Sequence, residues 1–404
     1  MLFLKMNSKK GSVSVFLVFI LTAMIGLSAA FIYASKQKAE VGICDGALNL
    51  AMRSVLSEYN LTLYERYGLM AFERNGMEAA LELNDYVDYS FEGRAPMKKT
   101  QVSFGNYSMA NMDNLREQIY EYMKYEGAAD LVRGNDTDIE RVEWRDRVLR
   151  NQGLIHTLPS RPFKDGGAGI MERIEALKDS VQSADSILSE ASGTYLIDRY
   201  IMNHFRYATG IPMDDASFFQ HEVEYILIGD YSNKDNRDKV EKTLKVFRTA
   251  LNAAFLYSNE KKYAQTLAAA ELLTPASAAA TQAVIIGTWS AVEAENDIKL
   301  LLKGRPVPLI KTEASWATSL DNVLNNVSEG LIDTGTDKGL HYSEYMMIFL
   351  HFMNEDVKLA RIADLIQINM KGTQDRSFIL KGCNEGMFVT TEICGKAHTY
   401  ETCY

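Results

Sequence analysis

The chain has 404 residues, of which 47% are hydrophobic and 24% are charged, with only 7 prolines and 26 glycines. This composition excludes disordered, collagen-like and small disulfide-rich proteins, and the length allows two or three domains. The 43 lysines and arginines are outnumbered by 53 aspartates and glutamates, so the net charge is −10. A general nucleic-acid binder is excluded on this ground, because such proteins present a basic surface to phosphate.

The N-terminal region contains residues 11–35, a run without a single charged side chain, which follows three lysines. As a helix, this run spans roughly 37 Å, which exceeds the hydrocarbon core of about 30 Å. We therefore predict a transmembrane helix at 11–35. The expected anchoring residues are Val13, Phe16, Leu17, Phe19, Ile20, Leu21, Ile25, Leu27, Phe31 and Ile32.

A cleaved secretory signal is the alternative interpretation, with Ser28, Ala29 and Ala30 as the small residues at its cleavage site. The apolar run continues beyond them to Tyr33, so its length favours a retained anchor. Long domains translocate largely regardless of charge. Residues 1–10 are therefore expected to form a short basic cytoplasmic tail, with the bulk of the chain outside the cell membrane.

A stalk is predicted directly after the membrane segment. Apolar residues recur at helical spacing through 36–60, opposite polar and charged residues. No proline occurs between residues 12 and 59. One continuous helix of about 48 residues is expected, with an apolar half and an amphipathic half. This is the layout of a pilin-type N-terminal helix.

The remaining chain is predicted to be mostly helical, so the expected fold class is helix-dominated α+β with two small strand regions. The expected segments are a mixed α/β segment at 61–133, a loop-rich linker at 134–169, a helical domain at 170–374, and a strand pair with a cysteine cluster at 375–404. Helices are predicted at 77–91, 111–126, 170–191, 195–208, 218–229, 236–258, 260–273, 317–328, 343–353 and 355–371, and strands at 99–107, 378–380 and 387–393.

Two local features qualify this assignment. The stretch between Glu271 and Glu293 is uncharged, but its Ala, Ser and Thr content favours a core helix beginning at Pro275 over a second membrane span. Ser343 and Asn354 occupy the positions where helix N-caps are expected.

Three of the four cysteines, Cys383, Cys394 and Cys403, lie near the C-terminus. A location outside the membrane permits disulfides, and we predict a bond between Cys383 and Cys394 across the terminal strands. Reduced, buried cysteines are the alternative. The chain has no CxxC motif, so a structural zinc site is not expected.

No motif typical of a zinc protease, a phosphate-binding loop, a dinucleotide-binding fold or a serine hydrolase occurs. His341, Glu344 and His351 are the residues that a membrane-tethered hydrolase or metal-dependent enzyme would use, if they met in one pocket. Capping and core roles are the simpler interpretation. We therefore assign no catalytic, cofactor-binding or metal-ligating residue, and we expect no enzyme activity, cofactor or small-molecule substrate.

Several segments resemble known families. The start at residues 10–17 resembles TadE/TadG-like minor pseudopilins of bacterial tight-adherence (Tad) pili. Segments 221–229, 307–309, 341–345 and 361–367, together with Trp316, resemble a family of unknown function. That family consists of single-span membrane proteins of Firmicutes, chiefly Clostridia. The resemblance implies association with Tad pilus loci.

One residue departs from the pilin pattern. A prepilin-type cleavage site resembles basic residues, a glycine, and a glutamate at the fifth position after it. Gly11 and Ser12 form the candidate processing site, but the fifth position holds Phe16. This departure argues against cleavage by a prepilin peptidase and equally against incorporation into a filament. The expected protein is a membrane-anchored accessory component of a pilus or secretion assembly, acting through protein partners. The alternatives are the tethered enzyme and a ligand-binding ectodomain.

Overall fold

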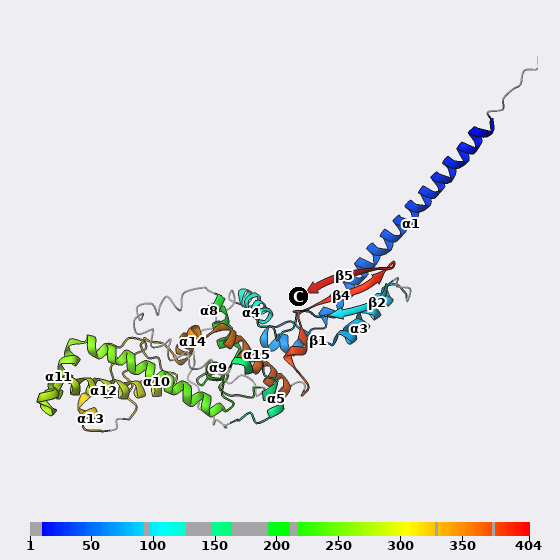
Figure 1. Ribbon diagram of the computed structural model, residues 1–404. Helices are drawn as coiled ribbons and strands as arrows, with labels where there is room; N and C mark the ends of the chain where they lie inside the picture. The colour runs from blue at the N-terminus through cyan, green and yellow to red at the C-terminus, as the bar shows by residue number, and fades with distance from the viewer. Residues whose placement is uncertain are drawn as a thin grey trace, which may run out of the picture. The chain divides into compact units, whose positions relative to one another are not determined.

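The computed structural model describes residues 10–92, 97–126, 147–163, 193–210, 217–327, 330–373 and 376–404. The described chain is mostly helical with two small antiparallel sheets, which confirms the predicted helix-dominated α+β class (Figure 1). It divides into two compact units. Unit 1 combines Met1–Asn60, Ala71–Ser108 and Gly382–Tyr404, and unit 2 combines Leu61–Met70 and Met109–Lys381. The units cut across the linear segments expected from the sequence.

Unit 1 is organised around α1 (Lys10–Ser57), a single helix of 48 residues, as the absence of proline predicted. Its two halves differ in burial. The side chains from Val13 to Tyr33 are exposed, whereas Leu48, Met52 and Val55 are buried. The amphipathic half is therefore the part of α1 that contributes to the hydrophobic core of unit 1.

The core of unit 1 forms where this half of α1 meets a three-stranded sheet and a second helix. The sheet has the order β2-β4-β5, and both pairings are antiparallel. Leu48 and Val55 from α1 pack with Leu83, Met387 and Val389. The remaining elements of unit 1 are α3 (Gly76–Ser90), β1 (Phe72–Glu73), β2 (Met97–Ser103), β3 (Cys383–Asn384), β4 (Gly386–Ile393) and β5 (Lys396–Cys403), and β1 pairs with β3.

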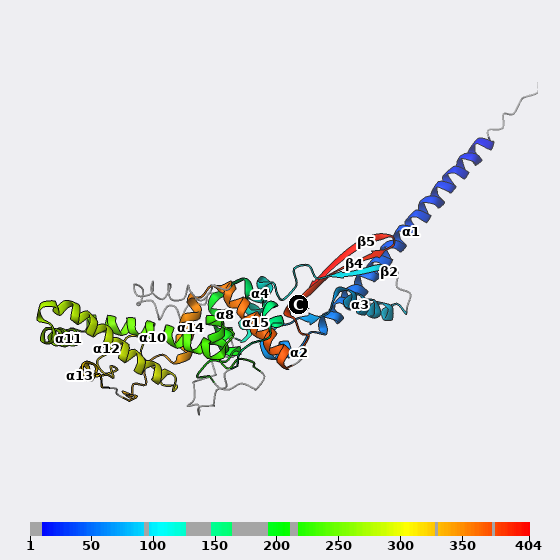
Figure 2. The same ribbon diagram turned by 60° about the horizontal axis from the view of Figure 1, so that its bottom comes forward.

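The β4–β5 hairpin lies along α1, as both views show (Figures 1 and 2). At one end, Cys394 Sγ donates a hydrogen bond to Glu40 Oε2 at 3.1 Å. At the other end, the hydroxyl of Tyr404 donates to the carbonyl oxygen of Leu56 at 2.5 Å. Between them the hydroxyl of Tyr400 donates to Asp45. The hairpin is therefore held along about four turns of the helix.

Unit 2 is helical. Its two longest helices, α10 (Asn233–Ser258) and α12 (Ala278–Leu301), pack on one another and on α11 (Glu260–Leu273). Leu256 of α10, together with Ile286 and Trp289 of α12, forms a core with Trp316. Its helices are α2 (Leu61–Tyr67), α4 (Met112–Glu126), α5 (Gln152–His156), α8 (Gly193–His204), α9 (Glu222–Ile228), α10 (Asn233–Ser258), α11 (Glu260–Leu273), α12 (Ala278–Leu301), α13 (Leu320–Leu324), α14 (Tyr342–Phe352) and α15 (Glu355–Thr373). Short 3₁₀ turns are η2 (Arg161–Phe163), η4 (Pro275–Ser277) and η5 (Leu380–Gly382).

The uncharged stretch after Glu271 forms η4 and most of α12. Pro275 begins the 3₁₀ turn, and Ile285 and Trp289 of α12 are buried. The predicted core helix is confirmed. Among the residues that the structure describes, α1 is the one helix long and apolar enough to cross a membrane.

Several local predictions are wrong. Residues 378–380 are not a strand, because the amide of Leu380 donates to Gln367 Oε1 at 3.2 Å and the chain turns into η5. β4 pairs with β2 on one side and with β5 on the other, and the sequence pattern did not predict β5. The N-cap of α14 is His341 rather than Ser343, and α13 covers only part of 317–328. The predicted helix at 170–191, the tail before residue 10 and most of the linker lie outside the described residues.

We predict that Leu48→Ala destabilises unit 1 by about 2–5 kcal/mol, because it removes a fully buried side chain from the contact between α1 and the sheet. Leu50→Ala is the matched control, since Leu50 is 63% exposed on the same helix. The measurement is the urea dependence of Cys383 alkylation in detergent-solubilised protein, because this buried thiol reports the opening of unit 1. Equal urea midpoints for the two variants would contradict the packing of α1.

Candidate functional site

The first candidate site is the N-terminal half of α1, which carries the ten predicted anchor residues. All ten are exposed, from 40% for Ile20 to 70% for Ile32. The most apolar stretch of the helix has no buried residue. Such a surface is stable only when lipid or other apolar helices cover it. By length and composition, α1 is consistent with a single membrane span or a signal sequence.

The candidate processing site at Gly11 and Ser12 falls in the first turn of α1. No feature of the helix tests cleavage there, so processing stays a prediction.

Two networks of buried polar side chains form the second candidate site, and both lie within unit 2. Each joins segments that are far apart in the sequence. The first, called the α9–α15 network, consists of Glu222, Glu224, Tyr342, Arg361, Asp364 and Asn369. The second, called the α10–α12 network, consists of Arg248, Asn252, Glu293, Asp297, Lys311 and Thr318.

In the α9–α15 network, the two glutamates of α9 bind different partners. Glu222 Oε1 accepts a hydrogen bond from Asn369 Nδ2 at 2.6 Å, and its Oε2 accepts one from the amide of Arg206 at 3.0 Å. Glu224 Oε1 accepts hydrogen bonds from the hydroxyl of Tyr342 at 2.8 Å and from a backbone amide at 2.9 Å. These bonds connect α9 to α14, to α15 and to the loop after α8.

The other half of this network joins α15 to the end of α9. Asp364 Oδ2 accepts from the hydroxyl of Tyr225 at 2.8 Å, and its Oδ1 accepts from the amide of Ser160 at 2.9 Å. Arg361 Nη1 donates to a carbonyl oxygen of α9 at 2.6 Å. Gly229 ends α9 with φ +79°, and a Cβ there would lie 2.6 Å from the Arg361 guanidinium. Glycine is thus required both by the backbone conformation and by the close approach of the arginine.

Burial changes the acidity of these carboxyl groups. It raises the pKa of Glu224 to about 7, although the hydrogen bond from Tyr342 opposes the rise. Burial likewise raises the pKa of Asp364 to about 6. The cause is the loss of water around the charged form, which hydrogen bonds offset only in part.

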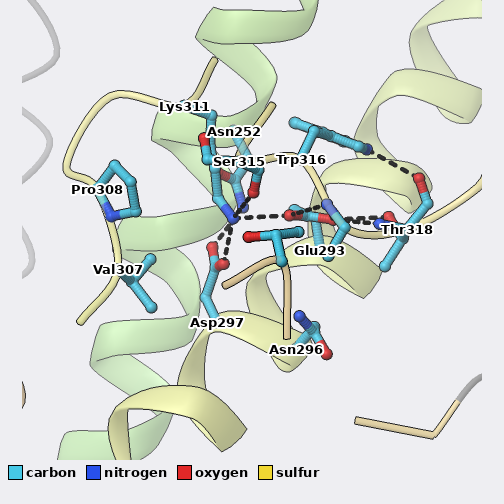
Figure 3. Close-up of polar contacts among 12 residues, drawn as sticks. Asn252, Glu293, Asn296, Asp297, Val307, Pro308, Lys311, Ser315, Trp316 and Thr318 are labelled. Atoms are coloured by element: carbon cyan, nitrogen blue, oxygen red, sulfur yellow. Dashed lines mark hydrogen bonds and ion pairs between the residues drawn. The ribbon is translucent and has the colours of Figure 1, made fainter. Parts of the chain in front are cut away.

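The α10–α12 network is built from full charges (Figure 3). Lys311 Nζ lies between two carboxylates of α12, 2.7 Å from Glu293 Oε1 and 2.6 Å from Asp297 Oδ1. Arg248 of α10 donates to Asp297 Oδ2 through Nε at 3.0 Å and Nη2 at 2.9 Å. Two cations thus face two anions. Burial by itself raises the pKa of Asp297, but the neighbouring Arg248 and Lys311 outweigh it and hold this pKa below its ordinary value.

Backbone groups complete this network. Glu293 Oε2 accepts hydrogen bonds from the amide of Thr318 at 2.9 Å and from its hydroxyl at 2.8 Å. Arg248 Nη1 donates to the carbonyl oxygens of Pro308 at 3.0 Å and Leu309 at 2.9 Å. The irregular segment after α12 is therefore fastened to the helices by charge-assisted hydrogen bonds, which are stronger than neutral ones.

Chemically, both networks suit an architectural role. The charges of the α10–α12 network are matched by neighbours of opposite sign, the carboxylates of the α9–α15 network accept hydrogen bonds, and the side chains of both are shielded from water. A catalytic group must reach substrate, whereas these groups face one another. They determine how α9, α10, α12, α14 and α15 pack.

Comparison with protein families decides the classification of the chain. Residues 107–395 match the model of a family described as a family of unknown function (DUF5702). The chain belongs to this family. No curated protein and no solved structure matches this chain.

The family match covers all the segments that suggested a family of unknown function from the sequence, which confirms that part of the resemblance. Each segment contributes to a network. Segments 221–229, 341–345 and 361–367 supply the α9–α15 network, and segment 307–309 supplies carbonyl acceptors to the α10–α12 network. Trp316 stacks on Phe255 beside that network. The recognisable residues of this family member are therefore packing residues of unit 2.

The residues named for a metal-dependent enzyme have separate structural roles. Glu344 Oε2 accepts from the amide of His341 at 2.7 Å, closing the start of α14, and His341 Nδ1 lies 3.2 Å from the carbonyl oxygen of Gly304. His351 lies about 15 Å further along the helix axis, with Nδ1 3.9 Å from Asp198 Oδ2. Metal ligands must approach within about 2 Å of one ion. In the described part of the chain, no three His, Cys, Asp or Glu side chains form such a group.

The predicted disulfide does not form in this structure. Cys383 and Cys394 are separated by the eight residues of β4. A strand of this length spans about 26 Å, whereas the Cα atoms of a disulfide lie within about 7 Å. The pairing is wrong because the hairpin turn is at Cys394 and Gly395, not at Asn384 to Gly386.

A surface cavity of unit 2 is relevant to the ligand-binding alternative. It has a volume of about 450 Å³, and Arg150, His156, Arg161 and Tyr231 contribute to its lining. None of the residues selected from the sequence lines it. Its described lining contains no residue of either network. Arg150 and Arg161 give the cavity positive charge, and the described lining residues contain no set of metal-ligating side chains.

We predict that Asp297→Ala destabilises unit 2 by about 3–5 kcal/mol, because it leaves two buried cations without their shared carboxylate. Glu295→Ala is the matched control. Glu295 lies on the same helix, is 53% exposed and pairs with Lys245 and Lys299, so its removal should cost at most about 1 kcal/mol. Urea unfolding followed by fluorescence of Trp289 and Trp316 measures both effects. A loss as small as that of Glu295→Ala would show that the network is not structural.

A pH dependence follows from Glu224. Its folded-state pKa of about 7 lies above its ordinary value of 4.5, so the folded protein binds this proton more tightly than the unfolded chain. The contribution of Glu224 to the free energy of unfolding is therefore largest at low pH and is lost as the pH rises through 7. Between pH 6 and 7 the loss is about 1 kcal/mol. Glu224→Gln should reduce this slope to the smaller contribution of groups such as Asp364, and Glu117→Gln on an exposed position of α4 should keep it in full. Identical slopes in all three proteins, measured by urea unfolding, would contradict the assignment.

Proposed function

We propose that this protein is a membrane-anchored, extracytoplasmic component of a Tad-type pilus or secretion apparatus, which acts through protein–protein contact. The observation that carries the proposal is the division of α1 into a fully exposed apolar half and a half packed in the core of unit 1. A helix of this kind joins a folded unit to a membrane or to a bundle of similar helices. The resemblance of residues 10–17 to pseudopilins supports the choice of a pilus-type apparatus.

The buried networks also support a structural component. The charged side chains of the α10–α12 network are shielded from water and pair with one another. A tethered hydrolase using His341, Glu344 and His351 has less support, because these residues cap α14 or lie near Asp198. Phe16 at the glutamate position of the pilin pattern favours an accessory role over that of the main filament subunit.

The test is affinity purification of the full-length protein from native membranes under pilus-expressing conditions. We expect pilus or secretion proteins to co-purify, and deletion of the gene to reduce surface pili or adhesion. A variant with Leu17→Arg and Leu21→Arg tests the role of α1. It places charges in the exposed apolar half of the helix and should abolish membrane retention and co-purification together.

N-terminal sequencing of the same membrane-bound material distinguishes a retained anchor from cleavage after Ala30 or between Gly11 and Ser12. A protein found entirely in the soluble fraction, or normal pili and adhesion in the deletion strain, would overturn the proposal.

A further inference from the structure

The second half of α1 brings one cysteine next to another from the opposite end of the chain. Cys394 Sγ donates a hydrogen bond to Glu40 Oε2 at 3.1 Å, and Cys44 lies one helical turn after Glu40. Side chains four residues apart on a helix are neighbours on the same face, about 6 Å apart. The next residue, Asp45, accepts a hydrogen bond from Tyr400 of the same hairpin. Cys44 therefore lies on the face of α1 that meets the turn containing Cys394.

The electrostatics agree with this placement. Burial raises the pKa of the Cys44 thiol, and the neighbouring Cys394 raises it further. The two sulfur atoms are thus within electrostatic reach of one another. Cys44 is buried and Cys394 is half-buried, so a reagent can reach the pair from the side of the turn.

The turn itself is an unusual place for cysteine. Cys394 has φ +51° and Gly395 has φ +76°, the conformation of a type I′ turn. Asparagine, aspartate or glycine suits the first of these positions better, because a Cβ is strained at positive φ. A cysteine here has a backbone cost that a covalent bond would offset.

We propose that Cys44 and Cys394 form a disulfide that ties α1 to the β4–β5 hairpin. Unit 1 is built from the first and the last segments of the chain, with nearly all of unit 2 between them in sequence. Closing so long a loop carries a large entropic cost, and a cross-link between its ends reduces that cost by restricting the unfolded chain. Glu40 retains Lys36 as a partner after the thiol hydrogen bond is lost.

The reaction is a thiol–disulfide exchange. The two thiols lose two protons and two electrons, the Cys44–Cys394 bond forms, and the disulfide of an extracytoplasmic thiol oxidant is reduced to two thiols. The proposal rests on the proposed function in one respect, since it requires residue 44 and the hairpin to lie on the oxidising side of the membrane. Cys383 and Cys403 remain thiols.

The test counts thiols in full-length protein from native membranes, quenched with N-ethylmaleimide and denatured, then reduced and labelled with a polyethylene-glycol maleimide. We expect two of the four cysteines to become labelled only after reduction, and mass spectrometry to link the peptide of Cys44 to Cys394. Cys394→Asn, which suits the turn, should abolish the reduction-dependent labelling. Cys403→Ser, at an exposed position, should leave it unchanged.

Blocking of all four thiols before reduction, or a link to Cys383 or Cys403, overturns the cross-link. Purified reduced protein incubated with oxidised glutathione then separates two causes of failure. If the Cys44–Cys394 bond forms in vitro, the pairing geometry is right and the location required by the proposed function is wrong. If it does not form, the pairing itself is wrong, whatever co-purifies with the protein.

Discussion

The structure depends on one helix that has to satisfy two different surroundings. The N-terminal half of α1 exposes an uninterrupted apolar surface, whereas its second half is the spine on which unit 1 is built. Because the helix has no break between the halves, the position of the core along α1 also determines how far the apolar half extends from it. The sheet and α3 can form a core only where α1 turns amphipathic, since only there does the helix have a distinct apolar face.

In unit 2, by contrast, buried polar groups determine how the helices pack. Its elements are connected by carboxylates such as Glu222 and Glu224, each of which accepts hydrogen bonds from two other segments, and by an arginine and a lysine that share Asp297. Removing such charges from water is costly, so each network is stable only when complete. These groups specify one arrangement of the helices more strictly than apolar contacts would, because a shifted helix would leave a buried charge unmatched.

Much of the fold follows from the sequence because the signals are local. The length of α1, the end of α9 at Gly229 and the start of the α12 region at Pro275 depend on proline, glycine and apolar periodicity over a few residues. The strand pairing does not, because β4 pairs on one side with β2, from the distant N-terminal part of the chain, and on the other with β5 across a turn. Cys394 and Gly395 gave no conventional turn signal, whereas Asn384 to Gly386 did, and the strand pair was therefore misplaced.

The candidate sites divide along the same line. The sequence by itself determined the long apolar N-terminal segment, the continuity of the helix and the family to which residues 107–395 belong, since each is a property of consecutive residues or short motifs. Only the tertiary structure decided what the charged residues do. Glu224 meets Tyr342, Lys311 meets two carboxylates, and Cys394 comes to lie beside α1, because packing brings together side chains from separate elements of the fold. Neither spacing nor composition encodes those contacts in a form that can be read along the chain.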